Sequence, residues 1–183
     1  MGRPIIRRAT LADAERLLNI YAYYVLNTAI TFDYQVPDIE GFREKMRKTM
    51  LKYPYLVLEQ EQTLLGYAYA GSFVGRAAYD WSAEVTVYLA PQERKKGYSK
   101  RLYDALERAL KDMGVLNLYA CIGYPNAEDE YLTKNSAEFH KHLGYRQVGI
   151  FNNCGYKFGR WYSMVWMEKM IGEHSENPDV VSN

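Results

Sequence analysis

Several features that would assign this 183-residue sequence to a particular class of protein are scarce or missing. No stretch reaches the roughly 20 apolar residues of a membrane-spanning helix, and residues 1–9 are charged without a following hydrophobic segment for secretion. The net charge is only +1, whereas a protein that coats nucleic acid needs a strongly basic surface. The sequence therefore predicts a cytoplasmic protein with no membrane partner and no nucleic-acid partner.

Cysteine is also scarce. Only Cys121 and Cys154 are present, far apart in the sequence and without a CxxC motif, and Cys121 lies inside an apolar run. Reduced thiols in the core are therefore expected, with a disulfide as the alternative, and no metal is required.

The common glycine-based phosphate motifs are missing as well. A P-loop needs two glycines followed by Lys-Ser/Thr, and a dinucleotide fingerprint needs three spaced glycines. The sequence instead has five cations around Gly97, just before a predicted helix: Arg94, Lys95, Lys96, Lys100 and Arg101. Free amides and the helix dipole attract anions at such a place, and glycine lets the backbone approach a ligand. The pattern predicts a diphosphate-binding turn, with a solvated basic loop as the alternative.

Hydrophobic periodicity predicts an α/β chain with a single domain over residues 1–171 and a flexible tail over 172–183. Helices are expected at about 10–26, 37–52, 100–113 and 134–143. Strands are expected at 4–8, 55–59, 63–70, 82–89, 115–122, 146–152 and 161–169. Strand 82–89 alternates, with Glu84, Thr86 and Tyr88 on its polar face.

The segment Arg94-x-x-Gly97-x-Ser99 resembles the Gln/Arg-x-x-Gly-x-Gly/Ala loop of the GNAT superfamily of acyl-CoA-dependent N-acyltransferases. The order of elements fits the GNAT fold, a mixed, mainly antiparallel twisted sheet with helices on both faces. The resemblance implies that acetyl-CoA is held by Thr86, Val87, Tyr88, Arg94, Lys95, Lys96, Gly97, Tyr98, Ser99 and Lys100. Ser99 departs from the usual glycine or alanine.

Six further motifs resemble phosphinothricin acetyltransferases and their relatives that act on methionine sulfone and sulfoximine. They are GYAYAG (66–71), AYDW (78–81), EVTVY (84–88), IGYPN (122–126), HKHLGY (140–145) and GYKFGRW (155–161). Together they cover most of the chain after residue 51 and are far more specific than the glycine loop alone.

This resemblance implies roles for individual residues. Glu84 matches the general base that takes a proton from the amine, and His140 matches the active-site histidine that would protonate the departing thiolate. An ordinary strand glutamate and a packed helix histidine are the alternatives, and His142 is expected to be solvated. Substrate contacts are implied for Phe32, Arg76, Tyr79, Tyr88 and Gly123.

Two departures from the family pattern stand out. Val74 replaces a lysine of the phosphinothricin acetyltransferases, so one cation for the substrate is missing. An insertion at 127–134 leaves open whether Asn126, or Asn135 together with Ser136, contacts coenzyme A.

The sequence thus predicts an enzyme that moves the acetyl group of acetyl-CoA to the α-amino group of a small modified amino acid. Another amine, such as an aminoglycoside, a polyamine or a protein amino terminus, is one alternative. A non-catalytic acyl-CoA-binding module is the other. The resemblance also implies a homodimer.

Overall fold

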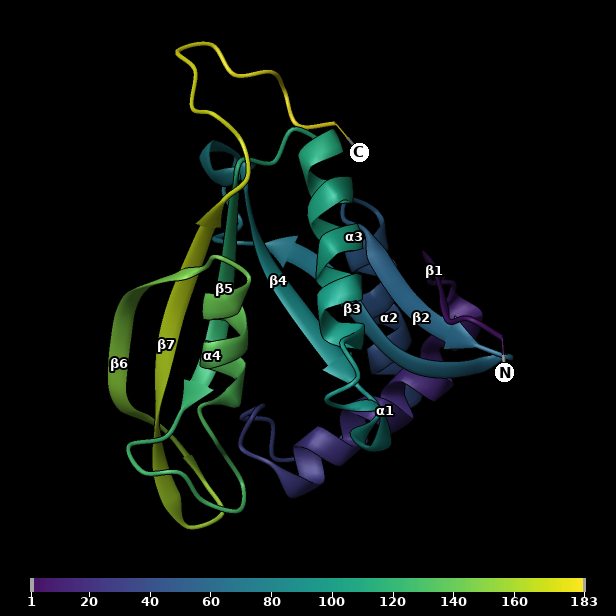
Figure 1. Ribbon diagram of the computed structural model, residues 1–183, viewed down its shortest axis with the longest axis vertical. Coiled ribbons are helices and arrows are strands. Elements are labelled where there is room, and N and C mark those ends of the chain that lie inside the picture. Colours follow the sequence, from purple (N-terminus) through teal and green to yellow (C-terminus); the bar gives the residue numbers. More distant parts are fainter. Residues whose placement is uncertain (1, 183) are drawn as a thin grey trace. The chain divides into compact units, whose positions relative to one another are not determined.

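The computed structural model describes residues 2–182 and contains the predicted order of helices and strands (Figure 1). The elements are β1 (Ile5–Arg8), α1 (Ala14–Asn27), α2 (Ile39–Met50), β2 (Tyr55–Gln60), β3 (Thr63–Ser72), β4 (Ser82–Leu89), α3 (Tyr98–Asp112), β5 (Asn117–Tyr124), α4 (Asn135–His142), β6 (Arg146–Lys157) and β7 (Arg160–Met170). Three short 3-10 helices are η1 (Leu11–Asp13), η2 (Ala77–Tyr79) and η3 (Pro91–Glu93). Across these described residues, no helix has both the length and the apolar character needed to cross a bilayer.

Two compact units make up the chain. Unit 1 contains residues 2–20, 37–118 and 170–182, and unit 2 contains residues 21–36 and 119–169. The single domain predicted from the sequence stays a prediction.

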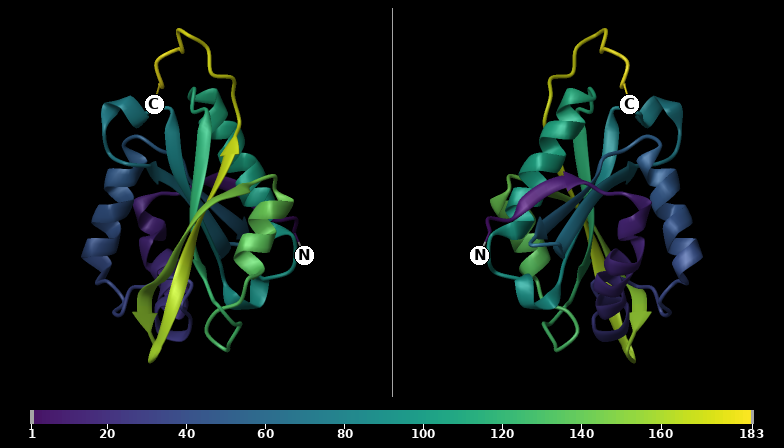
Figure 2. Two further views of the ribbon diagram at one scale, coloured as in Figure 1. Left: turned by 90° about the vertical axis from the view of Figure 1, so that its left-hand side faces the viewer. Right: turned by 90° about the vertical axis from the view of Figure 1, so that its right-hand side faces the viewer.

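Unit 1 is built on four antiparallel strands in the order β1-β2-β3-β4. β2 and β3 are joined by a two-residue turn, in which Glu61 and Gln62 have φ of 48° and 66°. Two positive φ values in a two-residue turn match the right-handed twist of the strands that it joins. The pictures show α2 and α3 on opposite faces of this sheet (Figure 2). Leu102, Leu106 and Leu110 of α3 are fully buried, as the predicted apolar stripe requires.

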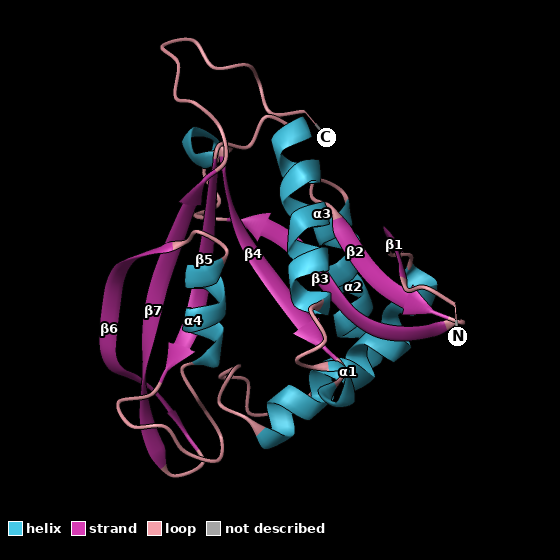
Figure 3. Cartoon of the chain, viewed as in Figure 1, coloured by secondary structure: helices cyan, strands magenta, loops and turns pink. Residues whose placement is uncertain are grey.

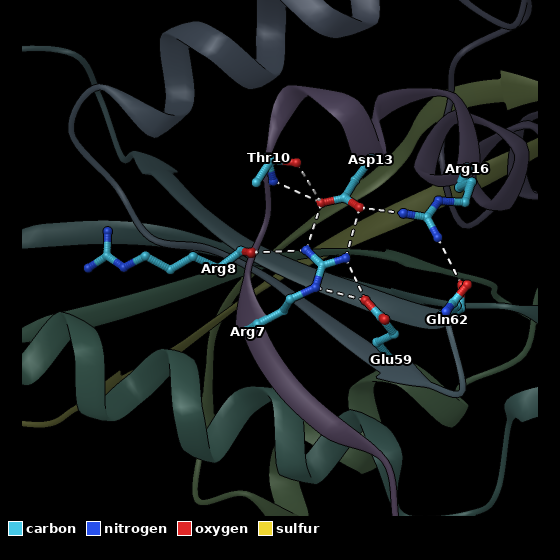
Figure 4. Close-up of polar contacts among 7 residues, drawn as sticks. All are labelled: Arg7, Arg8, Thr10, Asp13, Arg16, Glu59 and Gln62. Carbon is cyan, nitrogen blue, oxygen red and sulfur yellow. Dashed lines mark hydrogen bonds and ion pairs between the residues drawn. The ribbon is translucent and has the colours of Figure 1, made fainter. Parts of the chain in front are cut away.

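The amino-terminal end of unit 1 is fixed by a buried carboxylate (Figure 4). Asp13 is 1% exposed and accepts two hydrogen bonds from the Arg7 guanidinium, at 2.8 and 2.9 Å. It also accepts from Arg16 at 2.7 Å and from the Thr10 N–H at 2.8 Å. The Asp13 carboxylate thereby caps the Thr10 amide at the start of this helical segment. The Arg7 hydrogen bonds hold the pKa of Asp13 far below its usual range.

Unit 2 is built on β5, β7 and β6, with β7 between the other two. β6 and β7 form an antiparallel hairpin that turns at Phe158 and Gly159, and α4 packs against β6 (Figure 3). Its small core contains Ala29, Leu132 and Tyr162. The hairpin positions the segment of residues 28–34, which carries Phe32.

The predicted end of β6 at residue 152 was wrong by five residues. Asn153 has φ of 49° and the pairing with β7 is irregular between Phe151 and Gly155, but the strand then resumes. Asn152 and Asn153 therefore mark a bulge inside the strand rather than its end.

The placement of the cysteines in the core was also wrong. Both cysteines are reduced, as predicted, but Cys121 and Cys154 are exposed. Cys121 alternates with the buried Ala120 and Ile122 along β5, so a run that is apolar in sequence still puts this side chain on the outer side of its strand. In the predicted tail, the Asp179 carbonyl accepts a hydrogen bond from the Trp81 ring at 2.8 Å.

We expect Asp13→Asn to lower the free energy of unfolding at pH 7 by about 2–3 kcal/mol, because it removes the buried negative charge that Arg7 and Arg16 share. A depressed carboxyl pKa stabilises the fold above the unfolded pKa of about 3.9, and this contribution is lost as the pH falls below that value. Urea titrations should therefore show the variant approaching the wild type in acid.

The exposed pair Glu40–Arg43 provides a matched control. Glu40→Gln should change stability by less than about 0.5 kcal/mol. An Asp13→Asn deficit of the same size at pH 7 and pH 2 would contradict the electrostatic origin.

Candidate functional site

Strand β4 presents an acidic residue on one face of the unit 1 sheet. Register with β3 pairs Glu84 with Gly71, Thr86 with Tyr69 and Tyr88 with Tyr67. Paired residues project to the same side, so Glu84 shares its face with a layer of stacked tyrosine rings. In that layer the Tyr69 and Tyr55 centroids are 4.8 Å apart. Glycine opposite Glu84 leaves room beside the carboxylate.

The electrostatic environment of Glu84 has two opposing parts. The residue is half-buried, and burial raises the pKa of its carboxyl. The Lys45 ammonium of α2 opposes that shift. Lys45 Nζ lies 5.9 Å from the centroid of the Tyr69 ring, on the face of the sheet that carries Glu84. A carboxyl in this setting can take a proton more readily than one in water.

The turn before α3 has the backbone geometry predicted for anion binding. Lys95 and Gly97 have φ of 62° and 78°, and Gly97 is the N-cap residue of α3. No side chain caps this helix end, its first turn carries no acid, and a Cβ at Gly97 would meet nothing within 4 Å. The amides of Tyr98, Ser99 and Lys100 therefore open a helix whose dipole favours an anion.

Part of the positive charge in this turn is already balanced. Lys96 is paired with Glu93 at 3.0 Å and Lys100 with Asp104 at 2.7 Å. Arg101 donates to the Pro4 carbonyl at 2.7 Å, so its guanidinium tethers β1 rather than facing the turn. The turn is thus less cationic than five basic residues within eight positions suggested, and its backbone amides matter correspondingly more.

The segment between β3 and β4 carries the predicted substrate arginine. Arg76 directly precedes η2, and its carbonyl accepts from the Tyr79 N–H at 2.9 Å. Tyr79 packs edge-on against Phe73, and Val74 is half exposed. Asp80 is paired with Lys52 at 2.6 Å, so it does not offset the charge of Arg76.

In unit 2, His140 is buried within α4. Its Nδ1 lies 2.7 Å from the Ser136 carbonyl, and its ring packs edge-on against Tyr145 with centroids 5.2 Å apart. A carbonyl only accepts, so Nδ1 carries a proton, and burial lowers the pKa of the imidazole. Neutral His140 therefore presents an acceptor at Nε2, which favours the packing role over that of an acid. His142 is exposed, as expected.

The two asparagine candidates for coenzyme contact differ in their surroundings. The side-chain amide of Asn126 donates to Asn153 at 2.9 Å and accepts from Ser163 at 3.2 Å. It is thus engaged at both ends within the β5–β7 region. Asn135 is exposed in the first turn of α4, next to Ser136.

Phe32 and Gly123 are fixed by close contacts within unit 2. A Cβ at Gly155 would lie 2.8 Å from the Phe32 ring, and a Cβ at Gly123 would lie 2.9 Å from the Ala29 carbonyl. Both distances are too short for any side chain, so each glycine makes room for the 28–34 loop.

The predicted site residues thus form two sets, each described within its own unit. Unit 1 contains Glu84, the turn before α3 and Arg76, while unit 2 contains His140, Phe32 and the asparagines. Lys45 was not identified from the sequence as a neighbour of Glu84. The one feature that could have indicated it is its position as a basic residue on the sheet-facing side of a helix. Lys157 was also given no role, although the GYKFGRW motif contains it.

Comparisons with known proteins agree with one another. Residues 6–166 match the model of the acetyltransferase (GNAT) domain family. The chain is 31% identical to a phosphinothricin N-acetyltransferase of Streptomyces viridochromogenes, covering 91% of this chain and 88% of that one. It is 28% identical to an L-methionine sulfoximine/L-methionine sulfone acetyltransferase of Salmonella typhimurium, covering 93% and 96%.

Among solved structures, the chain is similar to a GNAT superfamily phosphinothricin acetyltransferase from Sinorhizobium meliloti in complex with AcCoA. The TM-score is 0.87 at 29% identity, covering 96% of this chain and 93% of that one.

We expect Lys45→Met to raise the pKa of Glu84, because the variant keeps burial and removes the nearby cation. The carboxyl pKa can be followed by carbon-13 NMR in glutamate-labelled protein, with Glu84→Gln assigning the signal. Lys48→Met on the same helix is the control, since Lys48 is exposed and paired with Glu44. An unchanged Glu84 titration in Lys45→Met would rule out this electrostatic link.

Proposed function

Because the chain belongs to the GNAT acetyltransferase family, we propose that it transfers the acetyl group of acetyl-CoA to the α-amino group of a small modified amino acid. The fold class predicted from the sequence is confirmed by the same family match and by the solved relative. The candidate substrates are of the phosphinothricin, methionine sulfone and methionine sulfoximine type, after the names of the relatives.

One arrangement carries the proposal: a half-buried carboxylate on β4, which leads directly into an uncapped helix start. β4 ends at Leu89 and α3 begins at Tyr98. Only residues 90–97, which include the anion-binding turn, therefore separate the strand that carries the base from the helix. A transferase of this kind needs both parts, since one holds the donor and the other activates the acceptor.

Acetyl-CoA supplies an activated thioester and a pyrophosphate that anchors it. The residues fit this group, because the amides at 97–100 are presented at a positively polarised helix end and Gly97 leaves the approach open. Arg94, Lys95 and Lys96 add positive charge, and Ser99 is small enough to leave the turn unchanged. We assign Thr86, Val87 and Tyr88 to the pantetheine and the thioester carbonyl.

Of the two asparagines that could contact coenzyme A, the geometry favours Asn135, together with Ser136. Asn126 already uses both ends of its amide inside unit 2. Moving it toward a ligand would leave Asn153 and Ser163 with lost hydrogen bonds.

Glu84 acts as the general base in this proposal. It takes a proton from the substrate amine, directly or through water, and frees the nitrogen lone pair for attack on the thioester carbonyl. A raised carboxyl pKa makes that transfer less unfavourable. Fixed amides then meet the charge that develops on the carbonyl oxygen. The departing thiol, with an ordinary pKa of about 8.5, needs little help, which agrees with His140 as a packed residue.

Within unit 1, Arg76, Tyr79 and Tyr88 are the residues that we propose to contact the substrate. Within unit 2, we propose the same role for Phe32 and Gly123. Arg76 suits a carboxylate, because a guanidinium binds it through two hydrogen bonds. Val74 offers no second cation for the phosphinate group of phosphinothricin. Methionine sulfone and sulfoximine have no such anionic group, so we propose that they are the better substrates.

A thiol-release assay with acetyl-CoA and this panel of amino acids tests the proposal. Glu84→Gln should lower kcat/KM by about 100- to 1,000-fold, because the base is lost. The Kd for coenzyme A, measured by calorimetry, should stay within about twofold, because Glu84 does not hold the donor. Glu173→Gln, at an exposed position, is the control.

Three outcomes would change the assignment. Full activity in Glu84→Gln would remove that residue from its role. Coenzyme binding without turnover of any amine would favour a non-catalytic module. Activity on a polyamine, an aminoglycoside or a peptide amino terminus alone would keep the reaction and change the acceptor. If Val74 explains the preference, Val74→Lys should improve phosphinothricin use by about tenfold through one charge-assisted contact.

We also propose that the protein is a cytoplasmic homodimer. In support of the dimer, β6 is the outer strand of unit 2, and Val148, Ile150 and Phe151 along it are 47%, 42% and 53% exposed. An apolar outer strand of this length is usually covered by a partner. Sedimentation equilibrium should give twice the mass of one chain, and a monomer at micromolar concentration would contradict the dimer.

A further inference from the structure

A buried lysine in unit 2 has no part in the chemistry described above. Lys157 is the last residue of β6 and is only 2% exposed. Its ammonium donates to the Thr28 carbonyl at 2.9 Å and to the Thr31 carbonyl at 2.8 Å. Charged lysines are almost never buried without such partners, because desolvation of the ammonium is costly.

The ammonium of Lys157 is fully engaged. Two of its three N–H groups bond to carbonyls, and the Nζ atom lies 5.1 Å from the centroid of the Phe158 ring, within range of a cation–π interaction. It therefore does not replace the cation that is missing at Val74. Its partners are backbone atoms three residues apart, so it recognises a conformation of the chain.

Other contacts hold the same segment to the rest of unit 2. The Ala29 amide donates to the Tyr131 carbonyl at 3.0 Å, and the Tyr34 hydroxyl donates to the Tyr156 carbonyl. The Phe32 ring lies directly on Gly155, where a Cβ would be only 2.8 Å away. Residues 28–34 are thus anchored near both ends and at Phe32, and Lys157 bonds to the first residue and to the middle residue of this segment.

We propose that Lys157 is a positioning residue, whose ammonium fixes the 28–34 loop so that Phe32 lies on Gly155 as a wall of the amine-substrate pocket. The pocket role of Phe32 rests on the proposed function, whereas the fixing of the loop rests on the contacts alone. A loop without regular secondary structure has few internal hydrogen bonds, so two bonds from one buried charge account for much of its order.

The placement of the two residues gives the GYKFGRW motif a physical meaning. Gly155 and Lys157 are two residues apart on one strand, so they project to the same side of it. The first provides the flat surface for the ring, and the second provides the donors for the carbonyls beside that ring. A side chain at position 155 should displace the Phe32 ring, and loss of the ammonium at position 157 should remove two hydrogen bonds. Both changes should therefore disturb the 28–34 loop.

The experiment compares Lys157→Met and Gly155→Ala with the wild type. Hydrogen–deuterium exchange of residues 28–34 reads the loop without any substrate, and initial rates give KM separately for methionine sulfone and for acetyl-CoA. Controls are Lys111→Met, an exposed lysine, and Gly149→Ala, a glycine of the same strand where a Cβ would meet nothing within 4 Å.

In both variants we expect exchange of the 28–34 loop to accelerate by about tenfold or more, while the controls match the wild type. The KM for methionine sulfone should rise by about tenfold and that for acetyl-CoA by less than about twofold, because only the amine side is misplaced. Thermal melts identify a variant that has unfolded, in which case the other variant decides.

Unchanged exchange in both variants would overturn the tether. Faster exchange with an unchanged KM for the amine would overturn the pocket role. A wild type that acetylates none of the amines refutes the proposed function instead, and the exchange measurement then still decides whether Lys157 holds the loop.

Discussion

The raised pKa of the Glu84 carboxyl comes from partial withdrawal from water, and strand pairing in unit 1 determines that position. Register between β3 and β4 fixes which side chains share a face, and it puts Gly71 opposite Glu84. Half-burial raises the carboxyl pKa while Lys45 limits the rise. A shift of that register by one residue would move Glu84 to the opposite face of the sheet, away from the Tyr69 ring and Lys45.

Much of the fold was predictable because its elements are strongly periodic. β4 was predicted with its observed ends, since strict alternation of apolar and polar residues leaves little choice. The end of β6 was not predictable in the same way, because a pair of asparagines looks alike in a bulge and in a turn. Cys121 shows a related limit: an apolar neighbourhood in sequence does not say which side of a strand is covered.

Only those residues of the candidate site that belong to a recognisable sequence motif were predictable. Glu84 and the glycine turn could be found by motif, whereas Lys45 and Lys157 act through contacts that join distant parts of the sequence. The number of unpaired cations in the turn could not be predicted from the sequence either, because Lys96, Lys100 and Arg101 each have partners in the folded chain. Such pairings depend on side-chain placement, which periodicity does not determine.

The uncapped start of α3 also has a thermodynamic consequence. A helix end that no side chain completes is less stable than a capped one, and an anion bound there would supply the missing acceptor. Any ligand that binds only the native state raises the unfolding free energy with the logarithm of its concentration. The melting temperature of this protein should therefore depend on the phosphate or nucleotide content of the buffer, which links its lifetime in solution to its supply of acyl donor.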